Sequence, residues 1–389
     1  MNQTAAAVAE TRLGFNVLGA LQMTVGGKPV TLGTPKQKAI LASLIINRNH
    51  PVASDRLISD AWEDRPPDKP DGSLHTYIAE LRKLLKEAGL DDKTVLARKP
   101  PGYQLALAED QCDIGRFQAK SAAGVRALNE GRFQQGRLFL VAALSEWKGA
   151  VLADLRDLQF AQVFGTALGR DYLTTLEKWA EAEIACGRAS VVLSRLEELV
   201  TEHQYEEPLW AQLITALYVT ERQTDALAAC RRLRKILRDD QGADPIPRIQ
   251  QLEERILRQE PLDAQEAAKL SALQTLTVIT QSSGGSAWPV TAYLRDARTG
   301  QSHALSSGLT NIGRLDDNDI MLADVEISRR HAAIVDTRAS YLIVDLRSRN
   351  GVQVDGERIK TSALLADGSA IRIGGYEFVF DIRADGPSQ

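Results

Sequence analysis

The sequence predicts a multidomain α+β protein with three folded parts in a row: a winged helix-turn-helix, an all-α tetratricopeptide-like array and an all-β sandwich. Three observations support this fold class. The 389 residues exceed one ordinary domain of about 100–200 residues. The hydrophobic period changes near residue 112 from mixed strand and helix to helix alone, and near residue 289 to strand. Within the helical part, a helix-turn-helix segment recurs.

These changes of period set the expected boundaries. We expect domains at residues 13–108, 112–258 and 289–382, with a linker at 259–288. The linker loses the helical period and ends in "SSGGSAW", a composition typical of flexible connections.

The first part begins with strands and continues with three helices. Residues 13–32 alternate apolar and polar side chains around Gly26-Gly27, which predicts a hairpin. Thr34-Pro35 and Ser54 are placed to cap the first two helices. The second helix is expected to bury Leu57, Ile58, Ala61 and Trp62, and the third to bury Leu74, Ile78, Leu81 and Leu85. Two short strands around Pro100-Pro101-Gly102 complete a winged helix.

The second part is predicted to be helical throughout. Three similar segments contain "LNEGRFQQGRLF", "EIACGRASVVL" and "YVTERQTDALA", and each joins a helix end, a short turn and an amphipathic helix. The rhythm of roughly 34 residues is that of tetratricopeptide arrays, which usually bind partners on a concave face.

Composition limits the possible functions. Hydrophobic content of 44% and charged content of 25% are near globular averages. No leader-like or membrane-length apolar run is visible, so we expect a cytoplasmic protein without membrane contact. The three cysteines are widely spaced and odd in number, which favours reduced thiols over disulfides or zinc. Residues 13–107 carry 13 Lys and Arg against 10 Asp and Glu, and the rest 34 against 41, so only the first part suits a polyanion.

Cationic and hydroxyl side chains follow the predicted strands of the last part. Gly313-Arg314, Ser328 to His331 and Asn350-Gly351 each lie where a strand begins or ends. If these loops converge, a guanidinium fork, a hydroxyl and backbone amides would share one shallow site, a set that suits a phosphate dianion. The alternative for any one of these residues is a solvated turn.

A second candidate surface lies on the third helix, opposite its leucine stripe. The face carries Ser73, Thr76, Arg82, Lys83 and Lys86, and Arg98 and Lys99 lie at the tip of the wing. Such a helix can enter a major groove while its cations meet phosphates. The alternative is a solvated face, and Asp71, Glu80 and Glu87 dilute its positive charge.

The last 90 or so residues resemble the forkhead-associated (FHA) domain, whose signature is G-R, then S-R-x-H, then N-G. The resemblance implies that Arg314 and Ser328 hold the phosphate of a phosphothreonine peptide and that Asn350 fixes the peptide backbone. It implies that Arg329 or Arg330 flanks the phosphate, and we add Ser348 to this set. His331, with Gly313 and Gly351, is expected to brace the loops rather than to act as a catalytic base.

The segments "LISDAWEDRPP", "LHTYIAELRKLL" and "PPGYQL" resemble the winged helix of the Streptomyces antibiotic regulatory proteins, related to OmpR-type response regulators. The helical part resembles their bacterial transcriptional activation domain. The resemblance implies a phosphorylated, DNA-binding transcriptional regulator under Ser/Thr kinase control. Its winged helix would bind double-stranded promoter DNA, its array would contact RNA polymerase or a second copy in a homodimer, and its FHA domain would dock a phosphothreonine-containing Ser/Thr protein kinase.

Two other functions compete with this one. The chain could be a phosphorylation-dependent adaptor that gathers kinase and clients without sequence-specific DNA binding, and the modest charge of the first part favours it. An enzyme is not expected, because no glycine-rich phosphate loop, metal cluster or catalytic triad is visible, and no cofactor is expected either.

Overall fold

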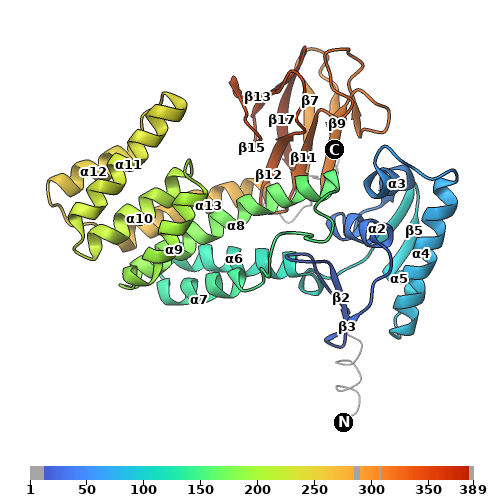
Figure 1. Cartoon of the computed structure of the whole chain (residues 1–389), viewed down its shortest axis with the longest axis horizontal. Helices are drawn as coiled ribbons and strands as arrows, with labels where there is room; N and C mark the ends of the chain where they lie inside the picture. The colour runs from blue at the N-terminus through green and yellow to red at the C-terminus, as the bar shows by residue number, and fades with distance from the viewer. Residues whose placement is uncertain (1–12, 284–289, 306–307, 385–389) are drawn as a thin grey trace, which may run out of the picture. The chain divides into compact units, whose positions relative to one another are not determined.

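A computed structural model describes residues 13–283, 290–305 and 308–384. The chain divides into two compact units (Figure 1). Among the described residues, the first unit contains 13–118, 146–171, 277–283, 290–305 and 308–384, and the second contains Ala119–Ser145 and Tyr172–Leu276. The winged helix and the sandwich therefore share one unit, and most of the helical array forms the other.

The first unit opens with a three-stranded antiparallel sheet in the order β1-β2-β3. Its strands are β1 (Leu13–Asn16), β2 (Gln22–Val25) and β3 (Lys28–Val30). The β2–β3 hairpin turns at Gly26-Gly27, as the sequence predicted. Leu13, Phe15 and Met23 are buried, so one face of this sheet belongs to the core.

The first two helices of the winged helix are α2 (Pro35–Ile46) and α3 (Ser54–Trp62). Thr34 caps α2 as predicted, because its hydroxyl accepts a hydrogen bond from the Gln37 backbone at 3.3 Å. The prediction that Ser54 caps α3 is wrong. The strand β4 (Val52–Ala53) runs directly into the helix, so the cap position falls on Ala53 and Ser54 is already helical.

The buried face of α3 also differs from the prediction. Leu57 and Ala61 are buried as expected, but their buried neighbours are Arg56 and Asp60 instead of Ile58 and Trp62. The polar pair is buried because Arg56 binds Asp60 and a carboxylate of the sandwich, described below. A sequence rule that assigns only apolar residues to the buried face of a helix cannot predict that Arg56 and Asp60 are buried.

The third helix, α4 (Pro70–Glu87), buries the four residues of its predicted stripe: Leu74, Ile78, Leu81 and Leu85. A short helix α5 (Asp92–Val95) leads to β5 (Leu96–Lys99) and β6 (Gly102–Leu105). These strands pair with β4 in the order β4-β6-β5 and form the predicted hairpin, here called the wing. The short 3-10 helix η1 (Glu109–Gln111) then leads to the array.

The seven helices of the array follow in chain order. They are α6 (Asp113–Asn129), α7 (Phe133–Leu144), α8 (Gln159–Ala185), α9 (Ala189–Glu202), α10 (Glu207–Val219), α11 (Gln223–Gln241) and α12 (Pro247–Leu257). The three predicted helix-turn-helix segments are α6–α7, α8–α9 and α10–α11. Trp210 on α10 is fully buried in the core that α8 to α12 share.

The prediction of an all-helical second part is wrong for residues 146–158, which form turns. The backbone of this segment pairs with the residues after β1: Lys148 donates to Leu18, Leu152 to Val17 and Ala153 to Gly19. Leu152 and Leu155 are buried there. A backbone that bonds to a distant loop cannot also form the hydrogen bonds of a helix.

The expected flexible linker contains a helix, α13 (Ala264–Ser283), so the prediction of a linker is wrong for these residues. Ala272 lies in a core cluster with Val125, Leu128, Leu140 and Ala182, and buried Ser271 bonds to buried Lys178 of α8. Small side chains let the helix approach closely without a conspicuous apolar stripe. Residues 284–289, "GGSAWP", which include the end of the expected linker, lie outside the described residues.

The last part is a sandwich of two sheets, as predicted. The five-stranded sheet has the order β10-β9-β11-β12-β15 and the six-stranded sheet the order β14-β13-β16-β17-β7-β8. The strands are β7 (Val290–Asp296), β8 (Ser302–Ala304), β9 (Leu309–Gly313), β10 (Ile320–Met321), β11 (Ala332–Asp336), β12 (Tyr341–Asp345), β13 (Val352–Val354), β14 (Glu357–Arg358), β15 (Ser362–Leu365), β16 (Ala370–Ile373) and β17 (Tyr376–Ala384). The inward residues of both sheets, among them Ile312, Ile343, Phe378 and Phe380, form the core.

Two further findings concern the described residues as a whole. None of their helices is both long and apolar enough to span a membrane. Within the same residues, no three His, Cys, Asp or Glu side chains are grouped as metal ligands. All three cysteines are free thiols, with Cys112 and Cys230 buried.

Candidate functional site

Three loops of the sandwich meet around Ser328. We name them the Arg314 loop (314–319), the Ser328 loop (322–331) and the Asn350 loop (346–351). The Arg314 backbone N–H donates to the Ser328 carbonyl at 3.0 Å, and the Arg349 backbone N–H donates to the Ser328 hydroxyl at 3.1 Å. The loops expected to form one phosphate site are thus in direct contact.

The His331 side chain bonds to the Ser328 loop and to the Asn350 loop. Its Nδ1 accepts from the Ser328 backbone at 3.1 Å, and its Nε2 lies 3.1 Å from the Gly351 carbonyl. Because a backbone N–H can only donate, Nδ1 carries no proton, and Nε2–H donates to Gly351. The ring is completely buried. It has the geometry of a brace and has no access to a reacting group.

Glycine is required at both ends of this arrangement. A Cβ on Gly313 would overlap the Arg329 carbonyl oxygen, so a side chain there would push the Arg314 and Ser328 loops apart. Gly351 has a φ of 75°, a left-handed conformation that side chains strain. The loops can therefore approach only with these two residues.

Four exposed arginines lie in the three loops. The guanidinium groups of Arg314 and Arg329 are exposed and form no ion pair within the described part of the chain. The same holds for Arg347 and Arg349, which sequence reasoning missed although "RSRNG" shows them flanking Ser348. Unpaired guanidinium groups beside a hydroxyl form a site for an anion with several oxygens.

Asn350 and Ser348 have different roles in the Asn350 loop. The Asn350 amide is exposed and donates to the Glu326 carbonyl at 2.8 Å, a bond that a ligand can replace. The Ser348 hydroxyl accepts from the Gly351 backbone at 3.0 Å, and the Ser348 backbone donates to Asp345 at 2.8 Å. Ser348 is thereby committed to the shape of the turn.

Arg330 differs from these four arginines because its guanidinium has partners within the protein. Its side chain is 17% exposed, donates to the Ser59 hydroxyl of α3 at 2.7 Å and to Gln159 at 3.2 Å, and pairs with Asp317. The two arginines that the sequence left as alternatives thus have different surroundings. Arg329 is exposed and has no ion pair among the described residues, whereas Arg330 contacts the winged helix.

A cavity of about 690 Å³ lies beside the site. Each of the three loops contributes to its lining, with Leu315, Arg329 and Arg347. Glu63 and Asp64 from the end of α3 line it as well. A segment bound at Ser328 would therefore have room next to it.

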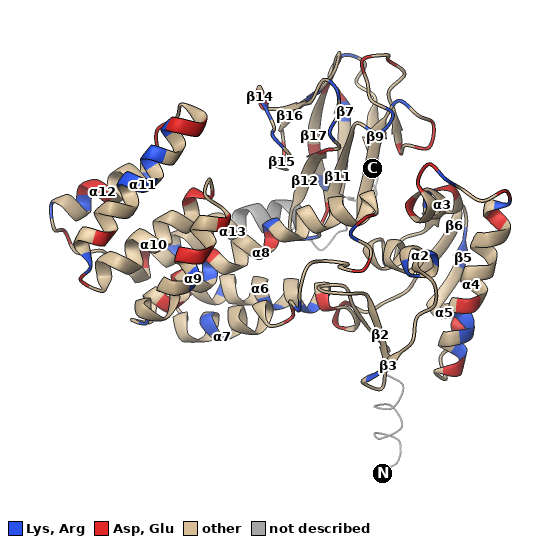
Figure 2. Cartoon of the chain, in the orientation of Figure 1, with Lys and Arg blue, Asp and Glu red and all other residues tan. Residues whose placement is uncertain are grey.

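The predicted DNA face of α4 carries exposed lysines. Figure 2 shows Lys and Arg in blue and Asp and Glu in red along this helix. Lys83 is 76% exposed and makes only a long ion pair with Glu87, at 3.8 Å. Lys86, Thr76, Arg98 and Lys99 are also exposed, whereas Ser73 is half-buried. Glu80 and Glu87 lie among the lysines, so the positive charge of the helix is interrupted, as the sequence suggested.

Arg82 does not project freely from this face. Its Nε and Nη2 donate to the Leu96 carbonyl at 3.0 and 2.8 Å, and its guanidinium lies 5.9 Å from the centre of the Tyr103 ring. The side chain thus joins α4 to the wing. A cavity of about 360 Å³ between them is lined by Lys83, Lys86, Arg98 and also His75, which the sequence reasoning missed.

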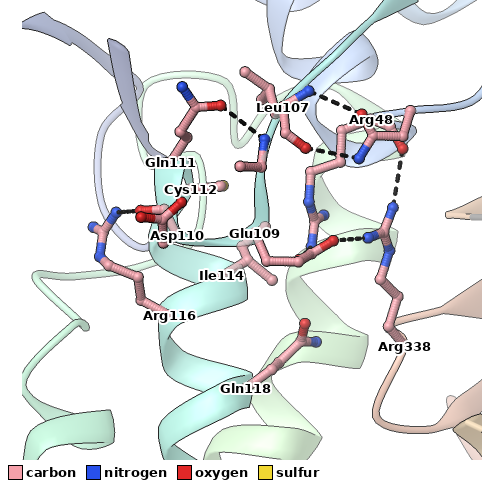
Figure 3. A network of polar contacts seen from close by, with 12 residues as sticks. Arg48, Leu107, Glu109, Asp110, Gln111, Cys112, Ile114, Arg116, Gln118 and Arg338 are labelled. Carbon is pink, nitrogen blue, oxygen red and sulfur yellow. Dashed lines mark hydrogen bonds and ion pairs between the residues drawn. The ribbon is translucent and has the colours of Figure 1, made fainter. Parts of the chain in front are cut away.

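The winged helix and the sandwich also meet through Arg338, in the turn between β11 and β12 (Figure 3). Arg338 pairs with Glu109 and donates to the Arg48 carbonyl at 2.9 Å. Arg48 is buried and pairs with the same carboxylate at 2.8 Å. Next to Arg338, the Ser340 hydroxyl donates to buried Asp171 at 2.9 Å, and burial raises the pKa of Asp171 to about 6.

Models of three families match the chain. The model of the C-terminal part of transcriptional regulatory proteins matches residues 27–105, that of the bacterial transcriptional activator domain 112–257, and that of the FHA domain 310–374. Together with the fold, they define the class: a winged-helix regulator of the Streptomyces antibiotic regulatory protein type that carries an FHA domain.

Relatives narrow this class. The transcriptional regulatory protein EmbR of Mycobacterium tuberculosis (strain H37Rv) is 53% identical over 378 residues, 97% of each chain. MoaR1 of the same strain is 46% identical over 250 residues, 64% of this chain and 80% of that protein. A solved structure of Mycobacterium tuberculosis EmbR in complex with a low-affinity phosphopeptide superposes with a TM-score of 0.94 at 52% identity, over 97% of this chain and all of that one. This chain belongs to the EmbR family of transcriptional regulators.

Proposed function

We propose that this regulator reads a phosphothreonine of a Ser/Thr protein kinase with its FHA domain and binds double-stranded promoter DNA with its winged helix. In this organisation residues 13–108 bind DNA, 112–258 form the activation domain, 259–288 connect it and 289–382 bind the phosphopeptide. The EmbR structure with a phosphopeptide supports the same use of the last domain here.

The observation that carries the proposal is the His331-braced meeting of three loops. It presents the Ser328 hydroxyl beside unpaired guanidinium groups of Arg314 and Arg329. A phosphothreonine dianion would accept from these groups, and Asn350 would exchange the Glu326 carbonyl for the peptide backbone. Arg347 and Arg349 add positive charge around the phosphate, and Ser348 acts on the ligand only through the shape of its turn.

The DNA contacts proposed for α4 and the wing are Ser73, Thr76, Lys83 and Lys86, with Arg98 and Lys99. Arg82 contributes by holding the wing against the helix.

The activation domain contacts RNA polymerase or a second copy of the chain. The proposed setting is the cytoplasm, where a regulator meets promoter DNA, and the proposed function uses no cofactor and no catalysis.

The proposal is tested by titrating the full chain with a phosphothreonine peptide selected from an oriented library and with its unphosphorylated form. Calorimetry should show binding of the first peptide alone. Equal affinity for both peptides would show that the protein does not recognise the phosphate at this site. In parallel, fragments retained from genomic DNA should share a sequence.

The charge pattern of α4 favours a second candidate, a phosphorylation-dependent adaptor without sequence-specific DNA binding. Glu80 and Glu87 interrupt the lysines, and Arg82 is bound to the wing. An adaptor would bind the phosphopeptide. It would either retain genomic DNA fragments that share no sequence or retain no DNA at all, even at low salt. The same selection experiment therefore separates the two functions.

A further inference from the structure

Two of the loops around the phosphate site rest on α3 of the winged helix. Arg330 of the Ser328 loop donates to Ser59 at 2.7 Å. Asp319 of the Arg314 loop accepts from Arg56 at 2.7 Å. We call these contacts the two seats. They join the candidate phosphate site to a helix more than 260 residues earlier in the chain.

The Asp319 seat is part of a continuous polar network. Arg56 is buried, and its Nε donates to Asp60 at 2.8 Å, while Asp60 accepts from Ser43 of α2 at 2.6 Å. Burial lowers the pKa of Arg56, but the two carboxylates together raise it above its ordinary value. On the other side, Asp319 also accepts from the Asn311 backbone at 2.7 Å, in the strand that ends just before Arg314.

The Arg330 seat is a short hydrogen bond between two half-buried side chains. Arg330 lies between Arg329, which is free for a ligand, and the brace His331. Beside it, the cavity lined by Ser59, Asn311 and Arg330 measures about 10 Å³. This is at the lower limit of the space that one water molecule needs. When the Ser328 loop moves together with Arg330, α3 must follow or lose this hydrogen bond.

A phosphopeptide that engages Asn350 changes these loops. The Asn350 amide donates to the Glu326 carbonyl, and a peptide backbone that takes the place of this carbonyl replaces the bond. The Ser328 hydroxyl accepts from the Arg349 backbone and can donate its own proton to a phosphate at the same time. A ligand shifts an equilibrium only through different affinities for two states. The loops with and without the Asn350–Glu326 bond are such states.

The helix that makes the two seats, α3, is also in contact with the helix that carries the proposed DNA face, α4. α3 is connected to α4 through residues 63–69, and the Trp62 and Tyr77 rings of the two helices lie 6.0 Å apart. A displacement of α3 would therefore reach the helix that carries Lys83 and Lys86. Coupling between two sites acts equally in both directions.

We infer that Arg56 and Ser59 of the DNA-binding domain are positioning residues of the phosphothreonine site, and that the two seats couple phosphopeptide binding to DNA binding. The inference rests on the proposed function. Arg56 and Ser59 touch neither phosphate nor DNA in this scheme. They act through Asp319 and Arg330 on the loops that do.

The test measures a coupling factor on the full chain: the dissociation constant for a selected genomic DNA fragment without the phosphothreonine peptide, divided by that at saturation with it. Fluorescence anisotropy of the labelled fragment gives both values. The seats are removed by Ser59→Ala with Asp319→Asn, which spares buried Arg56. The matched control, Asp55→Asn with Asp316→Asn, changes exposed residues of the same helix and the same loop.

We expect the native chain and the control to show a factor that differs from one by roughly fivefold or more, the usual lower range of coupling. The variant without seats should show a factor within about twofold of one and a several-fold weaker peptide affinity. Ser59→Ala alone should lower the factor part of the way, with an unchanged circular dichroism spectrum. The Ser59→Ala variant keeps the test informative if the variant with both Ser59→Ala and Asp319→Asn does not fold.

Two outcomes overturn the inference alone: a native factor of one with phosphate-dependent peptide binding, or a native-sized factor in the variant without seats. Equal affinity for the phosphorylated and plain peptides overturns the proposed function and the inference together.

Discussion

The His331 ring accepts a hydrogen bond from the Ser328 backbone at 3.1 Å, so the residue proposed to hold phosphate is positioned by a buried neighbour three positions later. The other ring nitrogen reaches Gly351 at the same distance. One side chain thus sets the spacing between two loops that are separated by the β11–β12 hairpin. The binding site and the core of the sandwich are linked through this ring.

Replacing His331 with Ala should loosen both loops. The Ser328 N–H and the Gly351 carbonyl would lose their partner, at a cost of about 1–3 kcal/mol for each buried group left unsatisfied. Hydrogen exchange should accelerate in residues 327–332 and 346–352, and phosphopeptide affinity should fall at least tenfold. His303→Ala, on strand β8, is the control. Native exchange rates in the His331 variant would contradict the brace.

Arg314→Ala and Ser328→Ala should each weaken phosphothreonine-peptide binding by roughly ten- to a hundredfold. The reason is the loss of one charge-assisted contact, worth about 1.5–3 kcal/mol. Calorimetry on the full chain measures the loss. Arg372→Ala removes an exposed arginine from strand β16 and should leave affinity unchanged. If the Arg372 variant loses as much as the Arg314 variant, the effect is general charge and the phosphate site lies elsewhere.

Lys83→Ala with Lys86→Ala should weaken DNA binding and reduce its salt dependence. Each lost phosphate contact lowers the slope of log affinity against log salt by about one. Filter binding at several salt concentrations gives the slope, and Lys28→Ala on strand β3 serves as control. If the slope of the lysine variant equals that of the native chain, DNA does not bind at these lysines of α4.

Arg82→Ala should act differently from the lysine variants, because its guanidinium donates to the Leu96 carbonyl. We expect faster hydrogen exchange in residues 96–105 and weaker DNA binding with a smaller change of salt slope. A variant with a native wing and a slope lowered by about one would instead identify Arg82 as a phosphate contact.

Asp171 should make the stability of the first unit depend on pH. Burial, opposed by the hydroxyls of Thr337 and Ser340 and reinforced by Asp336, raises its pKa from 3.8 to about 6. A folded-state pKa above the unfolded value means that the protonated form stabilises the fold, so the stability gain is lost as pH rises towards and through 6. Between pH 5 and 7.5 the loss should be on the order of 1 kcal/mol.

The measurement compares native and Asp171→Asn chains by urea denaturation across this pH range. The difference in unfolding free energy should change between pH 5 and 7 and be flat above it. A constant difference from pH 5 to 7.5 would show that Asp171 does not titrate there.

The sequence by itself determined the elements whose pattern is local. The stripe of α4, the hairpin at Gly26-Gly27 and the alternation of the sandwich strands follow from side-chain periods of 3.6 and 2, which neighbouring residues are enough to reveal. The grouping of Arg314, Ser328, His331 and Asn350 could also be anticipated, because strand ends of one sandwich place their loops together.

Only the tertiary structure decided which way individual polar side chains turn. Arg329 and Arg330 are adjacent and chemically identical, yet one is free and the other binds Ser59, 271 positions away. Arg56 and Asp60 are buried, residues 146–158 leave the helix and α13 packs on the array for the same kind of reason. In each case the hydrogen-bonding or packing partner is remote in the chain, and a local pattern of polarity holds no information about a partner that only folding brings near.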